Sequence, residues 1–138
     1  MRASDAYDLR ACLRSAGMRA TRPRLALAAL IFEAGHRHLT AEGLHREAAH
    51  TGTRLPLATV YNTLHRLTEA GLLQRIVVDA RRSYFDTNTT PHYHFFDEDH
   101  GRLVDIPAEA VELSRLPEAP AGTEVESVDV IIRVRRTG

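Results

Sequence analysis

The chain has 138 residues, 43% of them hydrophobic, and its 18 arginines balance 18 aspartates and glutamates in the absence of any lysine. These values indicate one or two small globular domains and exclude a disordered chain. The sequence has no apolar run long enough to cross a membrane, and its first ten residues lack the apolar core of a signal peptide. We therefore expect a cytoplasmic protein that does not contact membranes.

The charges divide the chain into a basic and an acidic part. Residues 1–82 carry 13 arginines and 7 acidic residues, a net charge of +6, whereas residues 83–138 carry 5 arginines and 11 acidic residues, a net charge of −6. A basic part can bind phosphates, and an acidic part can gather carboxylates around a cation. The distribution therefore predicts two functions in one chain.

Three helices are predicted near the start of the chain, the first of them over residues 5–16. Each follows a residue that can cap a helix, namely Ser4, Thr21 and Thr40. Each ends at a glycine, namely Gly17, Gly35 and Gly52. The side chains that we expect to face the core are Leu25, Ala29 and Phe32 in the second helix and Leu44 and Ala48 in the third. The single cysteine, Cys12, is expected to be a small core residue.

A fourth helix is predicted within residues 57–73, LATVYNTLHRLTEAGLL, with Gly71 at its end. Its apolar residues recur at the spacing of one buried face, at Val60, Leu64 and Leu67. The residues on its other faces that can contact DNA are Thr59, Tyr61, Asn62 and Arg66. Hydroxyl and amide groups can bond base edges or phosphates, and arginine can pair with a phosphate. An ordinary amphipathic surface helix is the alternative.

Two strands follow, over residues 72–78 and 83–87, and a basic hairpin tip with Arg81 and Arg82 connects them. Helices followed by such a hairpin are typical of a winged helix, in which one helix enters the major groove and the wing touches the DNA backbone. This pattern predicts that the basic part of the chain binds double-stranded DNA.

The second part of the chain is mixed. We expect strands over residues 92–96 and 102–106, a short helix over 107–113 and a strand over 124–134. The whole is an α+β fold, with an N-terminal winged helix-turn-helix domain (residues 1–87), a hinge (88–91) and a small α/β dimerisation domain (92–138). The last of these is short for an independent core, so a second copy of the chain is expected to supply the missing burial.

His92 and His94 lie two residues apart, so on a strand both side chains point to the same face and can reach one ion. Asp86 and Asp105 can converge with them, together with a histidine from the first part of the chain. Imidazole and carboxylate ligands suit Fe(II), Mn(II) or Zn(II). Solvated or hydrogen-bonded histidines are one alternative. An Fe(II) enzyme with Asp86, His92 and His94 as ligands is a remote one.

Several motifs resemble the ferric uptake regulator (Fur) family in their order and spacing over about residues 10–136. They are GMRATRPRLALAAL (17–30), HRHLTAEGLH (36–45), LATVYNTLHRLTEAGLL (57–73), YFDTN (84–88) and PHYHFF (91–96). Within the family the chain is most similar to the iron response regulator (Irr) branch, because of YFDTN, HYHFF, the Asp-Ile-Pro at 105–107, PEAPAG and VDVIIRV.

The resemblance implies a homodimeric repressor that is not an enzyme, that reads palindromic, AT-rich operators and that controls iron and haem homeostasis genes. It implies that Tyr61 corresponds to the tyrosine of the family's recognition helix, which contacts thymine. It also implies that Arg19 corresponds to a basic residue that enters the minor groove. It also implies that one divalent metal binds each chain, with the ligands His38, Asp86, His92, His94 and Asp105.

Aspartate at both acidic ligand positions resembles the peroxide-sensing (PerR) branch, so a peroxide sensor that uses Fe(II) or Mn(II) is the alternative. The paired cysteines of the family's structural zinc are absent, and Asp97 and His100 stand at the first pair. We therefore expect no structural zinc. The resemblance to the Irr branch also makes His92 and His94 candidate axial ligands for haem.

Overall fold

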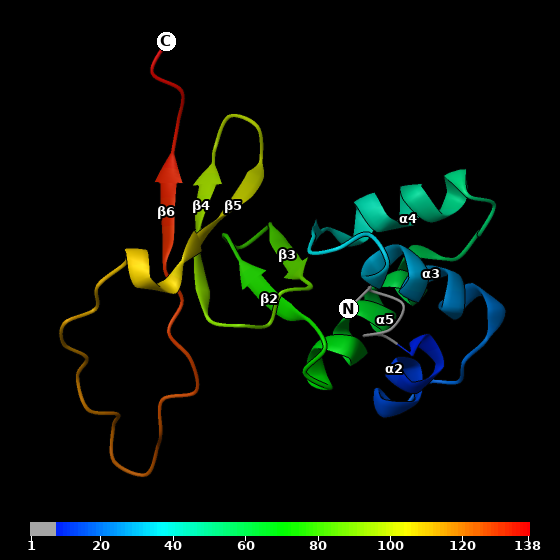
Figure 1. Cartoon of the computed structure of the whole chain (residues 1–138), viewed down its shortest axis with the longest axis horizontal. Helices are drawn as coiled ribbons and strands as arrows, with labels where there is room; N and C mark the ends of the chain where they lie inside the picture. Colours follow the sequence, from blue (N-terminus) through cyan, green and yellow to red (C-terminus); the bar gives the residue numbers. More distant parts are fainter. Residues whose placement is uncertain (1–7) are drawn as a thin grey trace. The chain divides into compact units, whose positions relative to one another are not determined.

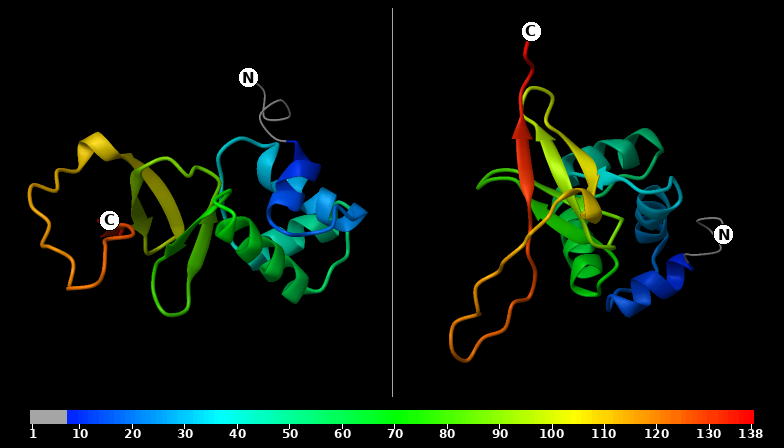
Figure 2. Two further views of the ribbon diagram at one scale, coloured as in Figure 1. Left: turned by 90° about the horizontal axis from the view of Figure 1, so that it is seen from below. Right: turned by 60° about the vertical axis from the view of Figure 1, so that its left-hand side comes forward.

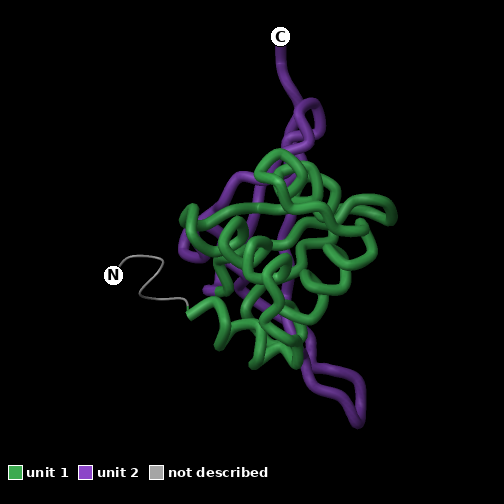
Figure 3. The backbone as a smooth tube through the Cα atoms, turned by 90° about the vertical axis from the view of Figure 1, so that its right-hand side faces the viewer, with its two compact units in different colours: residues 1–89 green, residues 90–138 purple. Residues whose placement is uncertain are grey.

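The computed structural model describes residues 8–138, and the chain divides into two compact units after Thr89 (Figures 1 and 3). This division falls inside the segment expected to be a hinge. The first unit holds the helices and a small sheet, and the second holds another sheet. The α+β class expected from the sequence is therefore confirmed. Among the described residues, no helix is both long enough and apolar enough to span a membrane.

The described part of the first unit contains four helices, namely α2 (Leu9–Ser15), α3 (Arg22–Phe32), α4 (Ala41–His50) and α5 (Leu57–Glu69). Thr21 and Thr40 cap α3 and α4 as expected, because each hydroxyl accepts a hydrogen bond from a backbone N–H in the first turn. The cap of α2 was expected at Ser4, which lies outside the described residues. Instead the Asp8 carboxylate accepts from the N–H of Ala11, and the helix begins at Leu9.

The core of the first unit is a single apolar cluster to which every helix contributes. Val60, Leu64 and Leu67 are fully buried on α5, as the spacing predicts. The prediction of the buried face of α3 is only partly right. Phe32 is buried as expected, but Leu25 and Ala29 are only half-buried. The other buried residues of α3 are Leu27, Ala28 and Ile31. α3 packs against both α2 and α4, so it buries a broader surface than one stripe. Cys12 is buried in this unit, and burial raises the pKa of its thiol.

A three-stranded antiparallel sheet completes the first unit, with the order β1–β3–β2. The hairpin of β2 and β3 is drawn in green in Figure 2. Its strands are β1 (His38–Leu39), β2 (Gln74–Val77) and β3 (Ser83–Asp86), so β2 is shorter than the expected 72–78. The sequence gives no sign of β1, because two residues are too few for a strand pattern. The β2–β3 hairpin follows α5 directly, which is the arrangement of a winged helix.

The second unit is a sheet in the order β5–β4–β6, in which β4 (His92–Asp97) pairs antiparallel with β5 (Arg102–Pro107) and parallel with β6 (Ile131–Val134). The expected helix over 107–113 is only a 3-10 turn, Ala108–Ala110. The expected strand over 124–134 begins at Ile131, and residues 111–130 form a long loop, drawn in orange in Figure 1. Successive side chains along each strand point to opposite faces of this sheet.

Candidate metal and DNA-binding sites

The first unit pairs a histidine with a buried aspartate. His38 on β1 is the register partner of Asp86 on β3, and His38 Nε2 lies 3.2 Å from Asp86 Oδ2. The Asp86 side chain is only 1% exposed, and its Oδ1 accepts a hydrogen bond from the backbone N–H of Asn88. This bond fixes the carboxylate and directs Oδ2 toward the imidazole.

Residues beside this pair hold the two strands in place. The N–H of Arg37 donates to Thr87 Oγ1 and the N–H of Thr87 donates to the Arg37 carbonyl, at 2.8 and 3.1 Å. The Arg37 guanidinium forms a two-pronged pair with Glu47 of α4, at 3.0 and 2.6 Å. The positions of His38 and Asp86 are therefore coupled to α4, which the sequence pattern did not indicate.

The second unit brings two histidines and an aspartate together on one face of its sheet. Asp105 is the register partner of His94, and its Oδ1 lies 3.5 Å from Nε2 of His94 and 3.5 Å from Nε2 of His92. The two imidazoles are 5% and 3% exposed, and their ring centroids are 4.5 Å apart. His92 and His94 therefore lie on the same face of the sheet, as expected for residues two apart on a strand, and Asp105 lies beside them.

These donors fit a divalent metal. His92 Nδ1 lies 2.7 Å from the Thr90 carbonyl oxygen, so this nitrogen carries the hydrogen and Nε2 keeps a lone pair. The lone pair on His92 Nε2 faces a carboxylate oxygen of Asp105 at 3.5 Å, which leaves room for a cation between them, and His94 Nε2 lies at the same distance from that oxygen. Two ligands at ~2.1 Å from a tetrahedral metal lie about 3.4 Å apart. In the first unit, Gln74 Oε1 on the strand beside Asp86 is a buried oxygen without a hydrogen-bond partner among the described residues.

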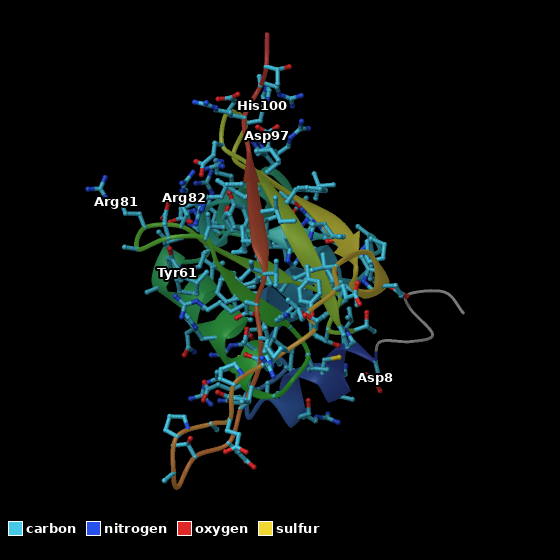
Figure 4. All side chains as sticks on the ribbon, turned by 90° about the vertical axis from the view of Figure 1, so that its left-hand side faces the viewer. Asp8, Tyr61, Arg81, Arg82, Asp97 and His100 are labelled. Carbon is cyan, nitrogen blue, oxygen red and sulfur yellow. The ribbon has the colours of Figure 1, made fainter. Side chains whose placement is uncertain are left out.

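The predicted DNA-reading residues fall into two groups. Tyr61 on α5 and the hairpin arginines Arg81 and Arg82 line one pocket of about 250 Å³, which is also lined by Thr40, Glu42, Ser83 and Tyr84 (Figure 4). Arg81 is exposed, whereas Arg82 pairs with Asp79 through its Nε at 2.9 Å. The bonds from Arg82 and from the hairpin backbone lower the pKa of Asp79 to about 2.

The remaining predicted readers lie elsewhere in the first unit. Asn62 and Arg66 are exposed, and they line a hollow of about 410 Å³ with the end of α2. Arg19 is exposed in the loop before α3. Thr59 is half-buried and its carbonyl accepts a hydrogen bond from Thr63 Oγ1. Tyr61 and Asn62 therefore do not share one surface, although they are adjacent in the sequence.

A polar cluster occupies the β4–β5 turn, where the family's cysteines were found to be missing. Asp97 Oδ2 accepts from Arg136 at 2.7 Å and lies 3.1 Å from His100 Nδ1. Its Oδ1 accepts from the backbone N–H groups of Asp99 and His100. Asp97 and His100 lie close together in Figure 4. The cluster ties this turn to the residues that follow β6, and Arg136 is a member that the sequence pattern did not reveal.

Comparison with known proteins places these features in a family. A model of the ferric uptake regulator family matches residues 15–133. The chain belongs to the ferric uptake regulator family. It is therefore a metal-responsive transcriptional regulator, and the alternative of an Fe(II) enzyme is rejected.

The relatives agree with this assignment. The ferric uptake regulation protein of Klebsiella pneumoniae is 29% identical over 107 residues, which cover 77% of this chain and 69% of that protein. The corresponding protein of Vibrio vulnificus is 28% identical, and the match covers 86% and 80% of the two chains. The ferric uptake regulator of Pseudomonas aeruginosa, solved with manganese, superimposes with a TM-score of 0.71 at 26% identity, covering 96% of this chain and all of that one.

Proposed function

We propose that the chain is a ferric uptake regulator-type repressor that binds palindromic, AT-rich operators as a homodimer when a divalent metal is bound. The observation that carries the metal part is the placement of His92, His94 and Asp105, whose ligand atoms face one another at 3.5 Å. The proposed ion is Fe(II), Mn(II) or Zn(II), because these metals accept imidazole and carboxylate ligands.

We infer that a single ion is shared by the two units. Together they supply three imidazoles and two carboxylates, from His38, Asp86, His92, His94 and Asp105. Five residues separate Asp86 from His92, so the two groups of ligands are tethered at ~20 Å or less. Such a tether gives the second group a high effective concentration at an ion held by the first.

The DNA part rests on the first unit. The net charge of residues 1–82 is +6, and two arginines, Arg81 and Arg82, line the same pocket as Tyr61. We propose that α5 enters the major groove while the β2–β3 hairpin contacts phosphates. Arg19, Thr59, Tyr61, Asn62, Arg66, Arg81 and Arg82 are the proposed DNA contacts. Arginine–phosphate contacts release counterions, so binding weakens steeply as salt rises.

The dimer part rests on the sheet of the second unit. The face opposite the histidines carries Phe95, Val104 and Ile132, which are neighbours across the three strands and are 37%, 53% and 40% exposed. An apolar stripe of this kind on a unit of 49 residues favours association with a second copy. The proposed metal ligands of the second unit thus lie on one face of its sheet, and the proposed dimer contact lies on the opposite face. Metal binding can therefore set the spacing of two DNA-reading units.

The finer proposal is an Irr-type regulator of iron and haem homeostasis, with His92 or His94 as a haem ligand. The motifs from 84–88 and 91–96 support it. The peroxide-sensing alternative is favoured by the two carboxylates, Asp86 and Asp105, because oxygen donors suit Fe(II) and Mn(II). Operator release by haem supports the first proposal, and release only after peroxide treatment of the Fe(II) form supports the second.

The metal proposal is tested by replacing His92 and His94 together with alanine and measuring the metal content of the purified protein after incubation with Mn(II). We expect the metal content to fall far below one ion per chain. His36→Ala with His50→Ala is the matched control, because both of these histidines are exposed and lie outside the ligand set. Full occupancy in the His92 and His94 variant contradicts the site.

A further inference from the structure

Tyr61 is held at two points in the structure. Its hydroxyl donates to Glu42 Oε2 at 2.8 Å, and its ring stacks on His65 with the centroids 6.2 Å apart. His65 in turn meets the ring of the buried Phe85 edge-on at 5.5 Å. The side chain proposed to read DNA is therefore fixed by a carboxylate at its polar end and by an aromatic ring along its side.

Glu42 is well placed to accept the hydrogen bond from Tyr61. It lies in the first turn of α4, where the helix dipole favours a negative charge, and it is exposed to solvent. Its hydrogen bond to the phenol is the largest cause that raises the pKa of Tyr61 above 10.0. The phenolic hydrogen therefore stays on Tyr61 at neutral pH and points toward Glu42.

This bond limits what Tyr61 can do at a base edge. A tyrosine hydroxyl has one hydrogen, and a hydrogen that is donated to Glu42 is not available for thymine O4 or for a phosphate. A thymine offers two features in the major groove, the O4 acceptor and the C5 methyl group. The ring of Tyr61 can still contact the methyl group.

We propose that Glu42 is a positioning residue that determines how Tyr61 reads DNA, by holding the hydroxyl so that the ring contacts a thymine methyl group. Glu42 and Tyr61 line the same pocket as Arg81 and Arg82, so the Glu42 charge also directs phosphates toward the arginines and away from Tyr61. The inference rests on the proposed DNA-binding function, and it adds a residue that does not itself contact the base.

The test compares two duplexes that differ only in methyl groups. The protein first selects an AT-rich palindrome from a random pool, and its affinity is measured by fluorescence anisotropy for that duplex and for a copy with uracil in place of thymine. Loss of one buried methyl group changes an equilibrium constant roughly fourfold. With one Tyr61 in each of two half-sites, we expect the native protein to prefer the thymine duplex by roughly fifteenfold.

Five variants separate the positioning role of Glu42 from the effect of its charge. Glu42→Ala and Tyr61→Phe each lose the hydrogen bond, so the preference for thymine falls toward one. The double variant is no worse than either single variant, because the two residues act through one bond. Glu42→Gln keeps an acceptor oxygen and retains the preference. Glu33→Ala removes an exposed carboxylate outside the pocket and serves as the charge control.

The inference would be overturned if the Glu42→Ala variant kept the full preference for thymine. It would also be overturned if Glu42→Gln lost as much of that preference as Glu42→Ala. Circular dichroism confirms that each variant is folded before its affinity is measured. The proposed function fails separately, if the native protein with metal selects no sequence from the pool.

Discussion

His38 and Asp86 face each other across the ladder between β1 and β3, with Nε2 and Oδ2 3.2 Å apart. The pair lies at the end of the hairpin that carries the wing arginines, and Arg37 links it to α4. A proposed pair of metal ligands thus lies in the same small sheet that positions the proposed DNA contacts. This arrangement is the physical reason to expect that metal and DNA binding are coupled.

Replacing His38 with alanine is expected to lower the affinity for Mn(II) at least tenfold, because loss of even an outer-shell partner typically lowers metal affinity ~10–100-fold. Isothermal titration calorimetry measures the change. His36→Ala is the control, since this exposed histidine lies two residues away and outside the ligand set. Equal Mn(II) affinities of the two variants would remove His38 from the site.

Replacing Tyr61 with alanine is expected to weaken operator binding by about 1–3 kcal/mol, because the side chain is proposed to contact a base. Asn62→Ala is expected to cost less, since Asn62 faces the hollow at the end of α2. Binding curves for both variants on one duplex test this order. A larger loss for Asn62→Ala would show that the other surface of α5 reads the DNA.

The two wing arginines are expected to differ. Arg81→Ala should weaken binding to all sequences and reduce the slope of log affinity against log salt by about 1, because one phosphate contact is lost. Arg82 already pairs with Asp79, so Arg82→Ala should change the slope less. Affinities measured over a range of salt concentrations give both slopes. Identical slopes for the two variants would mean that DNA displaces Asp79 from Arg82.

Local patterns predicted much of the fold. Capping at Thr21 and Thr40, the buried face of α5 and the turn at Gly71, whose φ is +80°, all follow from short-range rules that the structure confirms. The shared face of His92 and His94 follows from strand periodicity in the same way, whereas the place of Asp105 opposite His94 depends on the pairing of β4 with β5.

Contacts between distant segments could not be predicted. β1 is too short for a periodic pattern, and its place beside β3 depends on a pairing over 48 positions, from His38 to Asp86. The bonds of Glu42 to Tyr61 and of Arg136 to Asp97 join residues 19 and 39 positions apart. β6 begins only at Ile131, although the alternation in the sequence starts earlier, because pairing with β4 defines it.

The Asp97 cluster gives a prediction about pH. Burial raises the pKa of Asp97, but the hydrogen bonds from His100 and the charge of Arg136 outweigh it and hold the pKa below 3.8. A carboxyl group with a lowered pKa in the folded state stabilises the fold above its unfolded pKa, and this contribution is lost as the pH falls through the folded value. Asp97 is therefore expected to stabilise the fold at neutral pH, to begin to lose this contribution below about pH 4 and to lose the rest as the pH falls through its folded pKa.

Arg136→Ala tests this contribution. Urea unfolding should show a lower midpoint than in the native protein at pH 7. The difference should shrink at pH 3, which lies below the unfolded pKa of ~3.9 where this contribution starts to be lost. Arg135→Ala removes a neighbouring charge for which the structure shows no contact with Asp97 among the described bonds, so it should leave the midpoint near the native value. An equal difference at both pH values would mean that Arg136 acts independently of the Asp97 carboxylate.

Operator affinity with and without metal tests the central claim most directly. The protein is stripped with a chelator, and its binding to the selected AT-rich palindrome is measured by fluorescence anisotropy, first without metal and then with Mn(II), at one salt concentration. We expect Mn(II) to strengthen binding at least tenfold in the native protein and to have no effect when His92 and His94 are alanine. Equal operator affinity of the native protein with and without Mn(II) would contradict the proposal that metal binding controls its contact with DNA.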